Sequence, residues 1–192
     1  AHESLAAVLL SQNDCAAAAD ACRKAIGLDA APGEPYLALG NALIGLGEFE
    51  AAIEPLCQAK ERLPDHAVIH NSLGVALLES NRLDEAEVAL RRAIELVPTM
   101  IEAYSNLAHL LILSHQPEDA AAHAWRAVEL DKGFAAGWNN LAGALLALDQ
   151  PAEALTAAER ALALGAVTAE AENTLGSALS ALARDREARM AF

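Results

Sequence analysis

Apolar and small residues recur along this chain with a helical spacing, and the whole pattern repeats every 34 residues. The stretch from Ala67 to Pro98, AVIHNSLGVALLESNRLDEAEVALRRAIELVP, predicts two amphipathic helices joined by a short polar turn. One leucine returns in every repeat and is always followed by alanine or glycine. These leucines are Leu5, Leu39, Leu73, Leu107, Leu141 and Leu175. A fixed period of this length indicates a solenoid of stacked helix–turn–helix repeats.

Alanine marks the second helix of each repeat in the same register. It stands at Ala18, Ala52, Ala86, Ala120, Ala154 and Ala188, and no insertion shifts the register. In one repeat the full pattern is Tyr36, Leu39, Gly40, Leu43, Phe49, Ala52, Leu56, Ala59 and Pro64. These residues resemble the tetratricopeptide repeat family. The resemblance implies an all-α fold, a right-handed α-solenoid of about five and a half repeats.

The register divides the chain into a single array of repeats at 1–32, 33–66, 67–100, 101–134, 135–168 and, in part, 169–192. Each repeat is expected to contain a first helix, A, and a second helix, B. The A helices are predicted at about 4–12, 34–46, 67–80, 101–114 and 135–148, and the B helices at about 15–28, 48–63, 83–97, 117–131 and 151–164. The sixth repeat is expected to begin near Thr168 and to stop inside its B helix. The array therefore resembles a fragment of a longer protein, with bare ends that allow end-to-end self-association.

The chain has 192 residues and a formal net charge of −14. Nucleic-acid binding needs clustered lysine and arginine, so neither nucleic acid nor an anionic membrane surface is expected as a partner. No uncharged apolar run is long enough to span a bilayer. Three cysteines, an odd number, imply no disulfide framework and favour the cytoplasm.

Residues with candidate catalytic or metal chemistry are sparse. His66 and His70 lie four residues apart, but the sequence places no third metal ligand beside them. The sequence contains no glycine-rich phosphate loop and no nucleophile elbow. We therefore expect no metal, no cofactor and no catalytic residues, and we do not expect an independent enzyme.

Asparagine is concentrated on the predicted A helices, which carry none of the 13 lysines and arginines. The resemblance implies that A helices line the concave side of the superhelix, where these asparagines would border a groove. Leucine, valine and isoleucine neighbours would bury apolar side chains of a ligand, and a histidine lies midway along. The candidate partner-binding residues are Asn41, Asn71, Asn106, His109, Asn139, Asn140, Asn173, Leu37, Val75 and Ile112.

An asparagine side chain offers one carbonyl acceptor and two amide donors. A row of such side chains can hold the backbone of an extended peptide largely independently of the peptide's sequence. Asn106 and Asn140, with the stretch AYSNLA around Asn106, resemble the asparagine ladder of the O-linked N-acetylglucosamine transferase superhelix. The alternative interpretation is that asparagine is a tolerated polar residue on an exposed helix face.

Three functional hypotheses follow from the sequence. The first is a protein–protein interaction scaffold that binds an extended peptide or partner segment in the groove. The second is a substrate-selecting arm of a larger enzyme such as a glycosyltransferase, and the third is a self-assembling structural module. The lack of cations on the A helices also predicts that an acidic terminal peptide binds less tightly than a neutral or mildly basic one.

Overall fold

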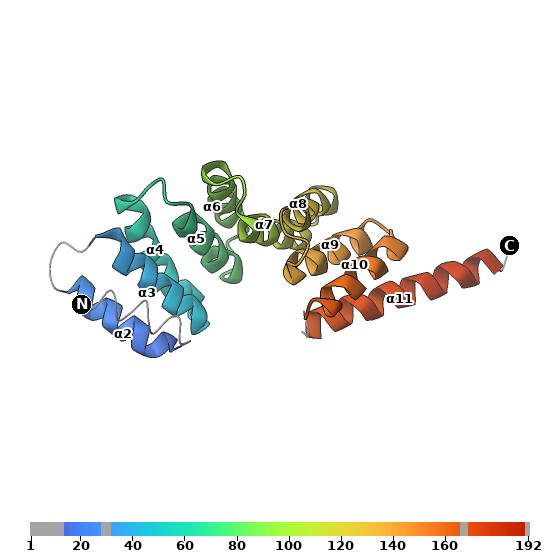
Figure 1. Cartoon of the computed structure of the whole chain (residues 1–192), viewed down its shortest axis with the longest axis horizontal. Helices are drawn as coiled ribbons and strands as arrows, with labels where there is room; N and C mark the ends of the chain where they lie inside the picture. The colour runs from blue at the N-terminus through green and yellow to red at the C-terminus, as the bar shows by residue number, and fades with distance from the viewer. Residues whose placement is uncertain (1–13, 28–31, 166–168, 191–192) are drawn as a thin grey trace. The chain divides into compact units, whose positions relative to one another are not determined.

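The computed structural model describes residues 14–27, 32–165 and 169–190, and these residues form ten helices and no strand (Figure 1). The A helices are α3 (Gly33–Gly45), α5 (Ala67–Glu79), α7 (Ile101–Leu113) and α9 (Ala135–Ala147). The B helices are α2 (Cys15–Ile26), α4 (Phe49–Arg62), α6 (Leu83–Leu96), α8 (Pro117–Leu130) and α10 (Pro151–Ala163). The chain ends in α11 (Ala169–Met190). The A helix predicted at 4–12 lies outside the described residues.

The chain forms two compact parts, an N-terminal segment (Ala1–Pro98) and a C-terminal segment (Thr99–Phe192). In the N-terminal segment α3 packs on α4 and α5 packs on α6, and α4 also contacts α5. The C-terminal segment repeats this arrangement with α7 on α8, α9 on α10, and α8 against α9. The A helices also touch one another, α3 with α5 and α7 with α9. The predicted all-α architecture of stacked helical hairpins is confirmed in each segment.

The core is built from the leucine and alanine positions that define the repeat. Leu39, Leu73, Leu107 and Leu141 are all buried. The equivalent alanines of the B helices, which are Ala52, Ala86, Ala120 and Ala154, are completely inaccessible to solvent. Small residues at these positions let the two helices of a hairpin approach closely, which explains how a core with few aromatic residues is filled.

Each of the four A-to-B turns within the described residues contains one residue with a left-handed backbone. These residues are Gly47, Asn81, His115 and Asp149, with φ of 74°, 60°, 57° and 58°. They stand 34 residues apart, and glycine, asparagine, aspartate and histidine are the residue types that tolerate this conformation best. The next amide closes the turn in the same way each time, as Arg82 N donates to Leu77 O at 2.9 Å. The left-handed residue therefore ends the A helix by satisfying its last carbonyl groups.

The sixth repeat departs from the prediction, because α11 is one continuous helix of 22 residues (Figure 1). The position equivalent to Asn81 is occupied by Ala183, which lies inside α11. Alanine is the strongest helix former and its methyl group disfavours the left-handed conformation. The helix consequently runs through the expected turn, and the prediction of a separate B helix there was wrong. It follows that α11 carries arginines near its end, unlike the other A helices.

Candidate interaction surface on the A helices

The six candidate asparagines do not lie in equivalent environments. Asn41, Asn71 and Asn106 are half-buried, and Asn173 is exposed on α11. Asn139 and Asn140, which are neighbours on α9, are buried with only 8% and 9% of their surfaces exposed. The six amides therefore differ in how accessible they are to a partner.

Asn140 is engaged inside the protein. Its Nδ2 donates to the backbone oxygen of Ser105 at 2.8 Å and to Ser105 Oγ at 2.9 Å. Ser105 lies on α7 and is itself buried, with 4% of its surface exposed. The two hydrogen bonds tie α9 to α7, so the amide of Asn140 acts as a brace between successive A helices.

Asn139 differs from its neighbour because its side chain makes no hydrogen bond within the described residues. Its Oδ1 is a buried acceptor without a partner in that part of the chain. Leaving such a group unpaired costs roughly 1–3 kcal/mol. Unpaired buried polar atoms are rare in folded proteins, and a ligand donor is one way in which they are satisfied.

The helix surface beside Asn139 is shaped by a close approach of α7 and α9. Gly143 lies one helical turn beyond Asn139, and a Cβ atom at Gly143 would meet Ile112 Cδ1 at 3.4 Å. Ile112 and His109 are half-buried on α7. These side chains and Asn139 therefore belong to neighbouring helices of the same segment.

In the N-terminal segment the candidate residues form two pairs, each separated by one helical turn. Leu37 and Asn41 lie on α3, and Asn71 and Val75 lie on α5. All four are half-buried, and α3 contacts α5. Residues four apart share a helix face, so each A helix presents one amide and one apolar side chain.

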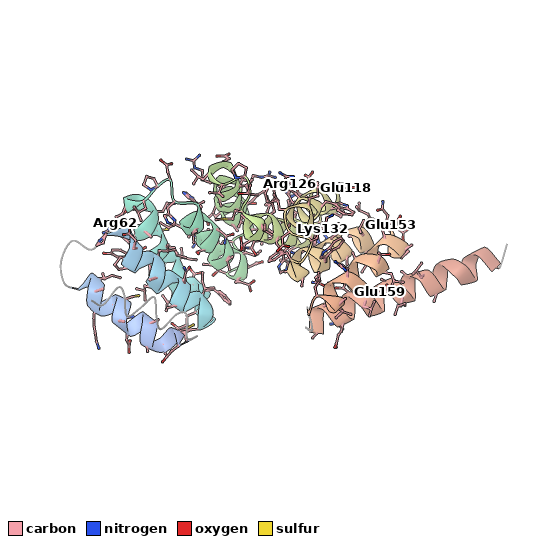
Figure 2. All side chains as sticks on the ribbon, viewed as in Figure 1. Arg62, Glu118, Arg126, Lys132, Glu153 and Glu159 are labelled. Atoms are coloured by element: carbon pink, nitrogen blue, oxygen red, sulfur yellow. The ribbon has the colours of Figure 1, made fainter. Side chains whose placement is uncertain are left out.

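Charge is distributed unequally between the two kinds of helix. The helices α3, α5, α7 and α9 contain no lysine or arginine, and the acids Glu34, Glu79 and Glu102 on them are exposed. Figure 2 shows side chains as sticks, and its labelled charged residues come from the B helices and a turn: Arg62 (α4), Glu118 and Arg126 (α8), Glu153 and Glu159 (α10), and Lys132 after α8. No group of three or more potential metal ligands is found among the described residues. The A-helix surface is thus neutral to acidic.

One feature of the N-terminal segment was missed by the sequence analysis. A pocket of about 710 Å³ lies between α4 and α6, with α5 beneath it. His70 and Cys57 are among its lining residues. The signal was present in the sequence, because His70 occupies the position where three other repeats have Tyr36, Tyr104 and Trp138.

These observations define the class of protein as an α-helical repeat solenoid. A family model described as tetratricopeptide repeat matches residues 37–101. Over these residues the chain matches the tetratricopeptide repeat family, and the repeat length, turn geometry and hairpin packing of the described residues agree with that match. Its sequence has no match among curated proteins. The narrower resemblance to the transferase superhelix stays a prediction.

Similar folds are found among solved structures. TTC0263, a thermophilic TPR protein in Thermus thermophilus, has a TM-score of 0.75 at 20% identity, covering 93% of this chain and 97% of that one. YrrB, described as a TPR protein with an unusual peptide-binding site, has a TM-score of 0.69 at 21% identity, covering 90% and 89%. MamA has a TM-score of 0.72 at 22% identity, covering 85% and 89%. At these identities the likeness establishes the fold.

No helix among the described residues has both the length and the apolar character needed to cross a membrane.

Proposed function

We propose that this chain is a protein-interaction scaffold, without catalytic activity of its own, that binds an extended peptide or partner segment along its A helices. The family is one of interaction modules, and YrrB is described as having a peptide-binding site. The observation that carries the proposal for this chain is the buried, unpartnered Oδ1 of Asn139. A backbone N–H of a bound peptide would supply the missing donor.

The proposed contact requires only a small movement of one side chain. Asn139 makes no internal hydrogen bond within the described residues, so rotation about its side-chain bonds breaks none there. A backbone N–H of the bound peptide would gain the Asn139 side-chain oxygen as its acceptor. Ile112 and His109 lie on α7, the helix next to α9 in the same segment. Backbone recognition of this kind is tolerant of ligand sequence. We propose similar but weaker contributions from the half-buried residues on α3 and α5.

The charge of the A helices supports a preference for neutral or mildly basic ligands. Glu34, Glu79 and Glu102 are exposed on helices that carry no lysine or arginine. A terminal carboxylate would find no cation there with which to pair. An acidic ligand would also be repelled by the net charge of −14. We therefore propose that acidic tails are disfavoured.

The alternative of an arm that selects substrates for a fused enzyme rested on an asparagine ladder. The Nδ2 of Asn140 is engaged within the fold, which leaves only its Oδ1 for a ligand, so this residue does not favour the alternative. The alternative of self-assembly has no specific observation in its favour. We therefore retain the scaffold as the proposed function.

The test compares peptide binding by the wild-type chain and by matched variants. Extended peptides with capped ends and the same apolar residues would be prepared in acidic, neutral and basic versions and titrated by isothermal titration calorimetry. We expect the neutral and basic peptides to bind more tightly than the acidic one. Asn139→Ala should weaken binding by about tenfold, the equivalent of 1.4 kcal/mol. Thr156→Ala changes an exposed polar residue on the B helix α10, outside the proposed surface, and serves as the control.

Two results would contradict the proposal. One is tightest binding by the acidic peptide. The other is unchanged binding by Asn139→Ala, which would show that this amide does not contact the ligand. Circular dichroism of each variant establishes that a loss of binding is not a loss of fold.

A further inference from the structure

Two tryptophan side chains pack together in the C-terminal segment. Trp138 on α9 donates its Nε1–H to the backbone oxygen of Lys132 at 2.9 Å. Its ring packs edge-on against Trp125 of α8, with ring centroids 6.1 Å apart. Two indole side chains therefore occupy the space between the B helix of one repeat and the A helix of the next.

The equivalent residues in the N-terminal segment stand 68 residues earlier and are much smaller. Trp138 corresponds to His70, Trp125 corresponds to Cys57, and Lys132 corresponds to Pro64. His70 Nε2 lies 2.7 Å from the backbone oxygen of Pro64. Because a carbonyl oxygen only accepts, Nε2 carries the hydrogen and donates, as the indole N–H does in the other segment. The imidazole thus reproduces the hydrogen bond of Trp138 but lacks its six-membered ring.

The pocket of about 710 Å³ lies where these two indole rings are missing. Its volume falls within the range of roughly 300–1,000 Å³ that is typical of ligand sites. Ile53 on α4 and Leu73 and Leu77 on α5 contribute buried apolar lining. Val88 on α6 also lines the pocket and leaves 71% of its surface exposed. The pocket is therefore apolar and open to an incoming side chain.

The rim of the pocket differs in charge from the rest of the chain. Its lining includes four cations, Lys60, Arg82, Arg91 and Arg92, and three acids, Asp84, Glu85 and Glu95. The lining thus carries a net charge of about +1, whereas the chain carries −14. The three arginines form ion pairs with carboxylates of the protein. Lys60 forms no ion pair within the described residues, although after Arg82 its charge also helps to lower the pKa of Glu85, and it can pair with an acidic group of a partner.

We propose that the pocket between α4 and α6 binds a partner protein's helix, which inserts an aromatic side chain and pairs an acidic residue with Lys60. The aromatic side chain takes the place that Trp125 and Trp138 fill in the C-terminal segment. A helix is the fitting occupant because the pocket is lined by residues of two flanking helices, α4 and α6, and a helix-in-groove contact presents side chains one turn apart. This site is separate from the A-helix surface proposed above and does not depend on it.

The probes are alanine-based peptides of helical propensity with capped ends. One contains a tryptophan and a glutamate four residues apart, a second has alanine in place of the tryptophan, and a third has lysine in place of the glutamate. We expect the first to bind at least about tenfold more tightly than the second, as measured by calorimetry. Replacing the glutamate with lysine should weaken binding about fivefold at low salt and less at high salt.

Variants of the protein locate the binding. His70→Trp keeps a donor for the oxygen of Pro64 and fills the pocket, so it should remain folded and lose binding of the tryptophan peptide by at least about tenfold. Cys57→Trp fills the pocket from α4 and provides a second test if His70→Trp fails to fold. Tyr36→Trp changes the equivalent position of the preceding repeat and should bind as the wild type does. Lys60→Glu should weaken binding, whereas Lys24→Glu on α2 should not.

The proposal is overturned if the wild-type chain does not distinguish the tryptophan peptide from the alanine peptide. It is also overturned if a folded His70→Trp or Cys57→Trp variant binds as tightly as the wild type. Free N-acetyltryptophanamide binding as tightly as the peptide would overturn the assignment of a helical partner. Asn139→Ala should bind the tryptophan peptide as tightly as the wild type, because Asn139 lies on α9 and does not line this pocket. A negative result for peptide binding on the A helices would therefore not affect this proposal.

Discussion

Gly74 on α5 and Leu90 on α6 share one volume in the core. A Cβ atom at Gly74 would lie 2.6 Å from Leu90 Cγ, and the preceding repeat has the same relationship between Gly40 and Leu56. The fourth and fifth repeats fill these two positions differently, with alanine at both. The alanine pairs are Ala108 with Ala124 and Ala142 with Ala158, and all four residues are completely buried. In these four repeats glycine on the A helix therefore goes with leucine on the B helix, and alanine goes with alanine.

The first prediction is that Gly74→Ala destabilises the N-terminal segment by about 1–3 kcal/mol through overpacking against Leu90. Leu90→Ala alone should cost about 2–5 kcal/mol because it leaves a cavity. The double variant should be less destabilised than the sum of the two, since the new methyl group occupies part of that cavity. Urea unfolding of the wild type, the two single variants and the double variant gives the coupling energy between the two residues, which we expect to be about 1–3 kcal/mol.

Gly176→Ala provides the matched control for this cycle. Nothing lies within 4 Å of a Cβ atom added at Gly176 on α11. The substitution should therefore stabilise the helix by roughly 0.5–1 kcal/mol, since alanine is the better helix former. Strictly additive effects at Gly74 and Leu90 would show that the two residues do not compete for space.

The second prediction concerns Asn139 and Asn140, which should respond to alanine with opposite signs. Asn140→Ala removes two hydrogen bonds to Ser105 and should lower the free energy of unfolding by about 1–3 kcal/mol. Asn139→Ala removes an unpartnered buried oxygen and should leave stability unchanged or raise it by about 1 kcal/mol. Denaturant unfolding monitored by circular dichroism measures both. Equal destabilisation by the two substitutions would indicate that Asn139 has a partner in solution.

The third prediction concerns the turn between A and B helices. Asn81 has a φ of 60°, so Asn81→Ala should destabilise the N-terminal segment by about 1–2 kcal/mol while Asn81→Gly should be neutral or slightly stabilising. Conversely, Ala183→Gly should weaken the continuous helix α11 at that point by about 1 kcal/mol. Hydrogen exchange of the amides that follow Ala183 reports the change. Unaltered protection there would mean that residue 183 does not control helix continuity.

Helix bounds could be predicted closely from the sequence because the register never shifts. The predicted helix at 117–131 is observed as α8, Pro117–Leu130, and the predicted helix at 67–80 is observed as α5, Ala67–Glu79. The error in the sixth repeat came from extending the register without asking what each turn requires. Alanine at residue 183 cannot supply the left-handed residue that ends the other A helices. The sequence contained that information.

The candidate site could be predicted only in part. A helical period indicates which residues share a face, and it placed Asn139 and Asn140 together on the expected surface. It does not indicate which of two adjacent amides finds an acceptor on the next helix, because that depends on a distance across the α7–α9 contact. The pocket beside His70 was missed because a histidine at an aromatic position was treated as a packing residue, without comparing its size with Trp138.

The last prediction is a pH dependence of stability at the start of α6. Arg82 donates to both carboxylate oxygens of Glu85 at 2.8 Å, and this hydrogen bonding holds the pKa of Glu85 below its ordinary value of 4.5. A carboxyl group with a lowered pKa in the folded state stabilises the fold above its ordinary pKa, and the stabilisation is lost as the pH falls through the folded value. Glu85→Gln should therefore melt below the wild type near about pH 7, and the difference should shrink towards about pH 3. Because both side chains are solvent-exposed, the effect should be small and should weaken in salt. Glu159→Gln on α10, where the carboxylate forms no ion pair within the described residues, is the control, and a difference for Glu85→Gln that grows on acidification would contradict the prediction.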